Sequence, residues 1–575
     1  MDKKTIILII ALGILVIFWI PIMTWLGVIN PRQQQPAEQK QTETVQPQKR
    51  PDSVTETAEY DRDTSAISPT PGQPTEISET DTATFIPEDS IVIETNNFEI
   101  TLTNHGGGPV SFKLKNYLYA NGEPIQMLPN CEQATPRLNF NNRSYPANKF
   151  VYESSVKPGR YSITSGEYEV AYTYTNSDGG QLIKRYRFNP DKYDYELIVE
   201  MENREALGFE REYLLEWQNP LEPTEINLED DYNNMWAMAL MGDERIKFDD
   251  YTNNMFKVSQ TGVTNWIASR SKYFTVILMP DGEAGTGAVA EGYKEKILVE
   301  GENITARRLS IGVMMELPYE ARVADSFTVY VGPADYEILA EYNNKTDDIV
   351  DIGTTPYVGW IIKIFAVPIM WLLPRMYNII PNYGLVIILF ALLVKLITWP
   401  LTKKAVQSMS AMRELQPKME ELKKKHKNNP QALQRETMKM YKEMGVNPLS
   451  GCLPYLPQMP LFFALFAVFR STILLRQASF ILWWDDLSRG ALSVTDPYII
   501  LVILMVVLMF LQQKMTMTDP KNKALMYIFP LMLGFLFYRA SAGLVLYWTC
   551  FSLFSFLEQI IFRRPSPKKT EVATE

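Results

Sequence analysis

The chain contains few of the residues that build disulfides, metal sites and histidine-dependent active sites. Three cysteines and two histidines occur in 575 residues. Cys131 is the only cysteine before residue 351, which excludes an internal disulfide in that part of the chain even in an oxidising compartment. His105 and His426 both lie outside the long apolar runs, which excludes a Ser-His pair or a histidine metal site inside a membrane segment.

The sequence also lacks a glycine-rich loop of the kind that cradles nucleotide phosphates. Glycines do cluster within Asp281–Gly287, but that stretch lies among predicted strands and is interpreted as a turn. With neither a metal-type cluster nor a phosphate cradle, the sequence predicts a protein that is not an enzyme and that uses no cofactor.

The net charge of −10 conceals an uneven distribution. Aspartate and glutamate predominate in residues 1–350, whereas lysine and arginine predominate in residues 351–575. Hydrophobic residues make up 46% of the sequence and aromatic residues 12%, which is compatible with a protein that combines soluble and membrane parts. An acidic first part and a basic second part are typical of an inner-membrane protein with a large outer domain.

The first 83 residues divide into an apolar run and a polar stretch. Ile6–Ile29 follows two lysines and is about as long as a membrane span requires. Because Gly27–Pro31 is a poor signal-peptidase site, residues 1–30 are predicted to form an uncleaved anchor helix with the N-terminus inside. Residues 31–83 are rich in Gln, Thr, Pro, Glu and Asp without hydrophobic clusters, which predicts a disordered tether.

Residues 84–345 consist of short runs in which apolar and polar residues alternate, punctuated by Asn, Gly, Pro and Asp. A period of two residues predicts strands with one buried face. We therefore expect one large antiparallel β-sandwich, for which a scaffold or docking role is favoured over carbohydrate or peptide binding. The clearest predicted strands are Ile91–Glu94, Phe98–Leu102, Val110–Leu114, Tyr168–Tyr174, Leu182–Phe188, Tyr195–Met201 and Phe274–Leu278.

The second part of the chain carries the remaining long apolar runs. Five of them, within residues 383–562, are predicted to cross the membrane as helices and to form a core. Together with the anchor helix they make a predicted bundle of six transmembrane helices. The five core spans are Tyr383–Leu401, Leu453–Leu474, Tyr498–Leu511, Leu525–Tyr538 and Leu544–Phe562.

A further apolar stretch, residues 356–380, has a different pattern. Pro368 and Pro374 interrupt it, and Lys363 and Arg375 add charges to it. These features suit a helix that lies in the membrane interface better than one that spans the bilayer. The sequence therefore predicts an amphipathic interfacial helix here.

Basic residues determine the predicted topology. They are concentrated in residues 403–447, in Lys514–Lys523 and in the tail, residues 563–575, and basic loops are retained in the cytoplasm. All three stretches fall on one side if the anchor helix begins inside and five spans follow the large domain. The sequence thus predicts a multi-pass inner-membrane protein with both termini cytoplasmic and residues 84–345 periplasmic.

The cytoplasmic residues 403–447 show a helical pattern of their own. Apolar residues recur every three or four positions on both sides of Lys427–Pro430, which predicts a helical hairpin. Methionine is flexible and polarizable, so this face suits the recruitment of varied apolar partners, although a coiled-coil seam that uses methionine is an equally good interpretation. The recruitment residues proposed from this pattern are Met409, Met412, Met419, Met440 and Met444.

One lysine stands inside a predicted span. Lys395 lies within Tyr383–Leu401, where a charge costs roughly 2.5–3.5 kcal/mol on insertion scales and needs a partner, a cavity or water. Other polar residues share helical faces in this span and in the last one. Each could make an ordinary interhelical hydrogen bond, but together they predict a hydrated groove. The candidate groove residues are Lys395, Thr398, Gln458, Met459, Gln512, Trp548 and Ser552.

Several motifs follow one another in the second part of the chain: Lys395 with Trp399–Thr402, Met412–Lys418, Asn447–Pro454, Gln458–Pro460 and Gly543–Trp548. Together they strongly resemble the motifs of the YidC family of membrane protein insertases. The resemblance extends to the layout of anchor, tether, outer sandwich, core spans and basic hairpin. Lys395 falls where the best-studied members have an arginine, which keeps the charge but loses the planar fork that suits carboxylates.

The resemblance implies a protein that inserts transmembrane segments of nascent proteins into the inner membrane, alone or beside the Sec translocon. In this family a groove that opens to the cytosol and to lipid, and is closed on the outer side, contains a positive residue. The implied partners are nascent membrane proteins, the Sec translocon, membrane lipids and, because the tail is short, only weakly the ribosome. Nucleic-acid sequence recognition is not expected.

The residues allow the same route on physical grounds. Lys395 would attract an acidic leader in a low dielectric, and the apolar helix behind it would pass Met459 and Trp548 into lipid. Transfer of apolar surface, at about 25 cal/mol per Å², would drive that step. A transporter of an anionic solute is the alternative, because a single intramembrane lysine could bind an anion, although the five core spans show no obvious inverted repeat.

Overall fold

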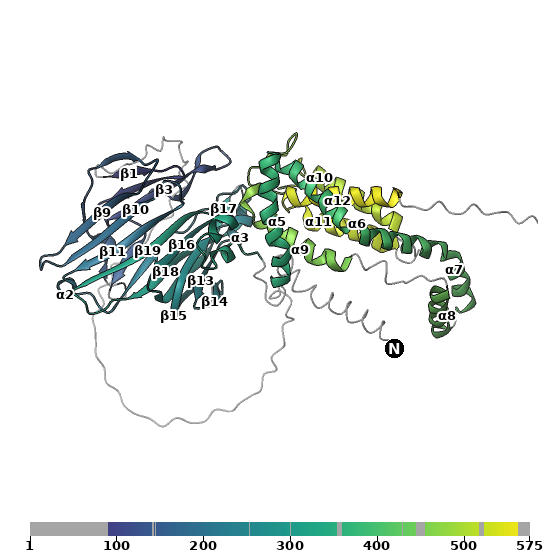
Figure 1. Ribbon diagram of the computed structural model, residues 1–575, viewed down its shortest axis with the longest axis horizontal. Helices are drawn as coiled ribbons and strands as arrows, with labels where there is room; N and C mark the ends of the chain where they lie inside the picture. Colours follow the sequence, from purple (N-terminus) through teal and green to yellow (C-terminus); the bar gives the residue numbers. More distant parts are fainter. Residues whose placement is uncertain are drawn as a thin grey trace, which may run out of the picture. The chain divides into compact units, whose positions relative to one another are not determined.

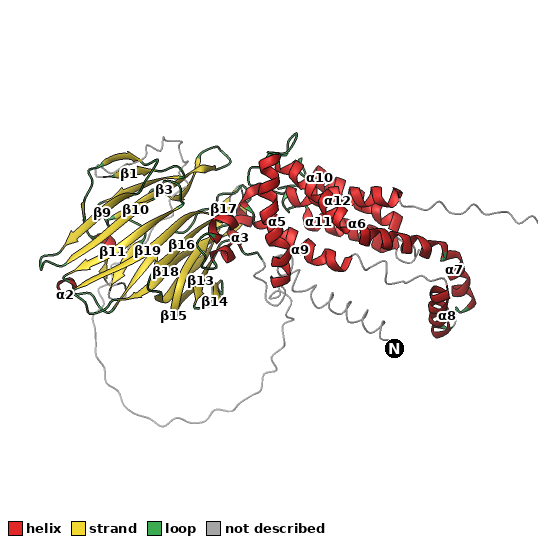
Figure 2. Cartoon of the chain, in the orientation of Figure 1, coloured by secondary structure: helices red, strands yellow, loops and turns green. Residues whose placement is uncertain are grey.

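The computed structural model describes residues 90–140, 143, 145–251, 254–299, 301–352, 359–427, 429–443, 455–516 and 523–561. The predicted anchor (1–30), tether (31–83) and basic tail (563–575) lie outside the described residues, as does the motif Asn447–Pro454. Strands predominate in the described residues up to 352, and the residues from 359 onward are mainly helical (Figure 2).

The strands form two sheets that pack face to face. The smaller sheet has the order β4 (Pro124–Leu128), β3 (Gly108–Leu118), β2 (Phe98–Thr103), β1 (Ile91–Glu94), β8 (Gly159–Ser162). The larger, 14-stranded sheet has the order β6 (Tyr145–Pro146), β5 (Arg137–Phe140), β12 (Glu212–Trp217), β18 (Glu302–Glu316), β17 (Gly285–Val299), β15 (Met255–Arg270), β16 (Phe274–Asp281), β19 (Arg322–Pro333), β11 (Asp194–Glu202), β10 (Gln181–Phe188), β9 (Tyr168–Thr175), β7 (Glu153–Ser154), with β13 (Trp236–Met241) and β14 (Glu244–Phe248) paired beside β15 (Figure 1).

Alternating burial explains why these segments become strands of a sandwich. In β11, Tyr195, Leu197 and Val199 are buried, whereas the residues between them are partly exposed. The two sheets share one core, in which the ring of Phe98 from the small sheet lies 6.5 Å from the ring of Phe188 in the large sheet. The predicted antiparallel sandwich is confirmed, and β1 and β8 make the single parallel pair among the described strands.

Short helices lie in the connections between strands and after the last one. They are η2 (Ala147–Lys149), α2 (Arg204–Leu207), α3 (Leu228–Asn233), α4 (Tyr336–Ala340) and η3 (Thr346–Val350). Asp335 caps α4, because its Oδ1 accepts hydrogen bonds from the backbone N–H groups of Glu337 and Ile338 at 2.9 and 3.2 Å.

The helical part begins where the sandwich ends. Its helices are α5 (Gly359–Ile379), α6 (Tyr383–Glu414), α7 (Gln416–Lys425), α8 (Pro430–Glu443), α9 (Tyr455–Ser471), η5 (Ile473–Leu475), α10 (Ile499–Thr516), α11 (Lys523–Phe537) and α12 (Ala542–Ile561). By length and composition α5, α12 and the Tyr383–Pro400 portion of α6 are the three candidate spans among the described residues. The apolar segments of α9, α10 and α11 are shorter, so their crossing of the membrane stays a prediction.

The stretch predicted to lie in the membrane interface forms α5, with Pro368 and Pro374 inside the helix. Its charged side chains pair with acidic residues that follow the last strand: Lys363 with Asp348, and Arg375 with Glu337 at 3.1 Å. Because α5 is also apolar enough to span a bilayer by composition, its interfacial position stays a prediction.

Candidate functional site

Helices α6 and α12 lie side by side (Figure 1), and polar side chains of these two helices meet at their contact. Leu, Ile, Val and Ala make up most of the first half of α6, so this segment is apolar, and its Leu and Ala residues favour a helix. Lys395 interrupts the apolar run, and it is only 7% exposed because α12 covers it. The sequence-predicted lysine is therefore buried between two helices.

Two hydrogen-bonding partners and one aromatic ring surround the Lys395 ammonium group. Its Nζ lies 2.6 Å from Glu558 Oε2 and donates a 2.9 Å hydrogen bond to Ser555 Oγ. The second carboxylate oxygen, Glu558 Oε1, accepts a 2.8 Å hydrogen bond from Thr402 Oγ1. The ring of Phe551 has its centroid 5.2 Å from Nζ. We call Lys395, Thr402, Ser555 and Glu558 the Lys395 cluster.

The ion pair between Lys395 and Glu558 is buried, and breaking it is costly. The side chains of Lys395 and Glu558 are 9% and 7% exposed, so water screens their attraction little. Removing one member of a buried pair typically destabilises a protein by about 3–5 kcal/mol, because the other charge remains buried without compensation. The cluster as a whole carries no net charge, which is different from the lone cation that the sequence suggested.

Glu558 is the functional candidate that the sequence analysis missed. The polar face predicted for the last span comprised Trp548, Ser552, Ser555 and Gln559. Glu558 follows Ser555 by three residues and therefore lies on the same side of the helix. An acidic residue near the end of a predicted span was the signal that could have identified the partner of Lys395.

Other predicted groove residues lie near the cluster with partners of their own. The Thr398 hydroxyl donates a 2.9 Å hydrogen bond to the Val394 carbonyl, so it is used within its own helix. Ser552 is buried on α12, one turn before Ser555. Trp548 meets Phe462 of α9 edge-on, with ring centroids 5.0 Å apart.

The remaining predicted groove residues belong to α9 and α10, which both contact α12. Gln458 and Gln512 are half-buried, and Met459 is 39% exposed. The structure therefore brings Lys395 together with the α12 face, while Gln458, Met459 and Gln512 are placed on neighbouring helices outside the Lys395 cluster.

The proposed recruitment methionines are only partly described. Met419 on α7 and Met440 on α8 are half-buried, and the Thr437 hydroxyl donates to Met419 Sδ at 3.6 Å across the two helices. Asn429 caps α8 by accepting a hydrogen bond from the backbone N–H of Ala432 at 3.0 Å. Met409 and Met412 lie in α6 with side chains outside the described part, and Met444 lies outside it altogether.

The end of the bundle where α6 and α12 begin is covered by the loop between η5 and α10. One backbone hydrogen bond joins this loop to the start of α12, from Ala542 N to Arg489 O at 2.8 Å. Another joins it to the α11–α12 connection, from Ala491 N to Tyr538 O at 2.9 Å. Asn382, just before α6, donates to the Phe480 carbonyl at 3.2 Å. The loop thus ties the two helices of the candidate site together at one end.

Acidic residues of this loop are used in its structure. Asp486 Oδ1 accepts hydrogen bonds from the backbone N–H groups of Gln477 and Ser488 at 3.0 and 2.8 Å. Asp485 accepts a 2.7 Å hydrogen bond from the Tyr498 hydroxyl. Within the described ranges, no group of three or more His, Cys, Asp or Glu side chains is placed to hold a metal ion.

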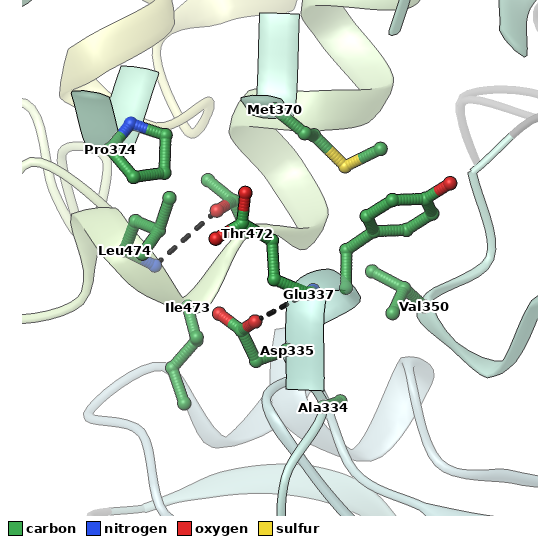
Figure 3. Close-up of a pocket in the computed structure, with 10 residues that line it drawn as sticks. Ala334, Asp335, Glu337, Val350, Met370, Pro374, Thr472, Ile473 and Leu474 are labelled. Carbon is green, nitrogen blue, oxygen red and sulfur yellow. Dashed lines mark hydrogen bonds between the residues drawn. The ribbon is translucent and has the colours of Figure 1, made fainter. Parts of the chain in front are cut away.

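A small pocket of about 70 Å³ lies where α4, α5 and η5 meet (Figure 3). Its polar groups are already used: Asp335 caps α4, and the Thr472 hydroxyl accepts a 3.3 Å hydrogen bond from the Leu474 N–H. The pocket therefore offers little to a ligand, and its lining consists of Ala334, Asp335, Tyr336, Glu337, Val350, Met370, Pro374, Thr472, Ile473 and Leu474.

Family models match both parts of the chain. The model described as the YidC periplasmic domain matches residues 90–372, and the model described as the 60Kd inner membrane protein matches residues 375–569. The boundary between the two matches falls within α5.

Individual relatives show the same similarity over most of their length. The membrane protein insertase YidC of Chlorobium phaeovibrioides is 36% identical over 492 residues, which cover 82% of each chain. The YidC protein of Chloroherpeton thalassium is 30% identical over 97% of this chain and 95% of its own. A crystal structure of an active YidC insertase, with its first transmembrane domain resolved, shares 20% identity at a TM-score of 0.34, over 82% of this chain and 92% of that one.

Proposed function

The chain belongs to the YidC family of membrane protein insertases, and we propose that it inserts transmembrane segments along a groove centred on the Lys395 cluster. The family is not a family of enzymes. It inserts membrane proteins, so its substrates are nascent membrane proteins. The observation that carries the proposal is a cation buried in a helix that is otherwise apolar enough to cross a bilayer.

The proposed route begins with the polar leader of a nascent segment. An acidic leader reaches Lys395, whose charge attracts carboxylates more strongly in a low dielectric than in water. The hydroxyl groups of Ser555, which contacts the lysine, and of Thr402 and Ser552 on the same helix faces soften the desolvation of the leader.

The apolar helix behind the leader then moves past Met459 and Trp548 into lipid. Its own transfer drives this step, because each buried leucine-sized side chain gains about 1.5–3 kcal/mol. Gln458 and Gln512, on the helices next to α12, complete the proposed polar lining. No nucleotide is consumed along this route.

Recruitment is proposed to take place on the helices that follow the membrane portion of α6. Met419 and Met440 present adaptable apolar surface on α7 and α8, and Met409, Met412 and Met444 would extend it. Lysines in the last turn of α7 favour the cytoplasmic side of the membrane for these helices.

The proposed topology has six transmembrane helices, both termini in the cytoplasm and the β-sandwich in the periplasm. The basic stretches 403–447 and 563–575 support this orientation. The Sec translocon is a proposed partner, and the ribosome is a proposed weak partner. The loop between η5 and α10, which covers the starts of α6 and α12, supports a groove closed on its outer side.

The test uses the purified full-length protein in liposomes and two single-span substrates that differ only in a leader with two Asp or two Asn residues. Lys395→Gln should lower the protease-protected fraction of the Asp-leader substrate by roughly tenfold, the equivalent of about 1.4 kcal/mol, and should affect the Asn-leader substrate much less. Lys395→Arg is the matched control, because it keeps the charge and should keep the preference. Equal losses for both substrates would show that the lysine only supports the fold.

A further inference from the structure

Glu558 holds the position that a substrate carboxylate would need. The Lys395 ammonium group makes its shortest contact, 2.6 Å, with Glu558 Oε2. Ser555 and the Phe551 ring take the other sides of the ammonium group. An acidic leader therefore meets an ion pair, and it can reach the lysine only by taking the place of a carboxylate that is already there.

The position of Glu558 along the bundle indicates from which side an arriving leader would meet it. Its second oxygen is bonded to Thr402, which lies beyond the apolar portion Tyr383–Pro400 and toward α7. In the sequence, Glu558 also lies shortly before Arg563 and Arg564 of the basic tail, which the positive-inside rule assigns to the cytoplasm. Given the proposed topology, the carboxylate lies on the cytoplasmic side of Lys395, on the path of an arriving leader.

Exchange of one carboxylate for another avoids the main cost of breaking a buried pair. The penalty arises when one charge is left uncompensated, and an arriving carboxylate compensates Lys395 as Glu558 leaves. A glutamate near the basic, cytoplasmic end of a proposed span can extend its carboxylate to water, as long side chains near membrane interfaces do. A leader without an acid offers no such compensation, so the pair stays closed.

We propose that Glu558 is a specificity-determining residue of the insertase: it is the resident counterion of Lys395, and acidic groups of the substrate displace it during insertion. This inference rests on the proposed role of Lys395. It assigns to Glu558 two effects, a threshold that an acidic leader must overcome and protection of the lysine against anions that are not part of a substrate.

The test compares the Asp-leader and Asn-leader substrates in liposomes that contain the full-length protein. Glu558→Gln removes the resident charge but keeps the side-chain shape, so the ratio of Asp-leader to Asn-leader insertion should rise by about threefold or more. Glu558→Asp retracts the carboxylate by one methylene and should give an intermediate ratio. The ratio of Asp-leader to Asn-leader insertion should therefore be highest for Glu558→Gln, intermediate for Glu558→Asp and lowest for wild type.

Glu443→Gln is the matched control. Glu443 on α8 is exposed, and it is only loosely paired with Lys439 at 3.9 Å. This variant therefore removes one negative charge from the chain without changing the Lys395 cluster. The ratio of Asp-leader to Asn-leader insertion should stay at the wild-type value. Thermal unfolding in detergent identifies variants that fail to fold. If Glu558→Gln does not fold, the insertion ratio of Glu558→Asp tests the inference instead.

Two results would overturn the inference. One is an unchanged ratio in folded Glu558→Gln, or in folded Glu558→Asp if the Gln variant does not fold. The other is an equal loss for both substrates, as expected of a residue that only joins α6 to α12. The proposed role of Lys395 fails separately, if Lys395→Gln leaves the ratio unchanged.

Discussion

Lysines at three positions of the described chain are almost fully buried, and their partners differ. Lys395 has a carboxylate in Glu558, and Lys272 has one in Asp230 at 2.9 Å. Lys184, in the core of the sandwich, donates instead to the Gly106 carbonyl at 2.7 Å and lies over the Tyr152 ring. A carbonyl does not compensate a full charge, so burial lowers the pKa of Lys184 to about 7.

The pKa of Lys184 predicts a pH-dependent stability. In the unfolded chain a lysine holds its proton up to about pH 10.4, whereas the folded protein releases it near pH 7. Between these values the unfolded state binds more protons, so the free energy of unfolding should rise with pH by up to about 1.4 kcal/mol per unit. Lys184→Met should remove this contribution.

The measurement is thermal unfolding of the full-length protein in detergent at pH 7, 8 and 9. Wild type should gain stability relative to Lys184→Met as the pH rises, since the other groups contribute equally to both proteins and cancel in the comparison. Parallel curves would mean that Lys184 remains charged in the folded sandwich.

At the scale of single residues, the sequence identified Lys395 but not its partner. An intramembrane charge is visible in a hydropathy pattern, because it interrupts a run of apolar neighbours. The contact with Ser555 and Glu558 joins positions about 160 residues apart, which local periodicity cannot reveal. Helical spacing did place Ser552 and Ser555 on one face, and the same spacing applied to Glu558 would have completed the site.

At the scale of elements, the regular strands were predictable and the long ones were not. Tyr195–Met201 alternates strictly because one of its faces is buried along its whole length. The strands β15, β17 and β18 extend beyond the core, so their outer halves are exposed and lose the alternation that predicts a strand. A register shift between Thr261 and Thr264 adds a further interruption.

At Gly490, the loop between η5 and α10 approaches the α11–α12 connection closely. A Cβ atom at this position would lie 2.4 Å from the carbonyl carbon of Arg539 and 2.5 Å from Ala540 O. Because both neighbours are backbone atoms, they cannot move aside as a side chain would. Gly490→Ala should therefore lower the free energy of unfolding by about 1–3 kcal/mol, the usual range for overpacking.

Thermal unfolding of the full-length protein measures this effect, with Val494→Ala as the control in the same loop. Val494 is 80% exposed, so its truncation should change stability little. A Gly490→Ala protein as stable as wild type would indicate that the loop does not hold the starts of α6 and α12 together.

At the scale of the whole chain, the charge asymmetry of the sequence reappears as contacts. Basic residues of the helical part meet acidic residues of the part that precedes it. Arg476 lies 2.6 Å from Glu225 and also donates to the Leu118 carbonyl at 2.8 Å, and its side chain is only 3% exposed. Arg539 lies 3.3 Å from Glu229 at an exposed position, where an ion pair contributes little.

The buried pair should couple the two parts energetically. A double-mutant cycle of Arg476→Gln and Glu225→Gln should give a coupling of about 1–3 kcal/mol in thermal unfolding, because the two groups are in contact and shielded from water. The same cycle on Arg539→Gln and Glu229→Gln should give less than about 1 kcal/mol. Equal values for the two cycles would contradict the assignment of Arg476–Glu225 as the contact that couples the sandwich to the helices.

The ion pair between α6 and α12 has a consequence for the synthesis of the protein itself. Ser555 follows Lys395 by 160 residues, and Glu558 comes later still, so a ribosome working at about 5–20 residues per second makes α12 roughly 8–30 seconds after α6. During that interval α6 must rest in the bilayer with a cation that has no counterion, which makes it a difficult segment to insert. We therefore expect α6 of a newly made copy to need an insertase or the Sec translocon until α12 has been made.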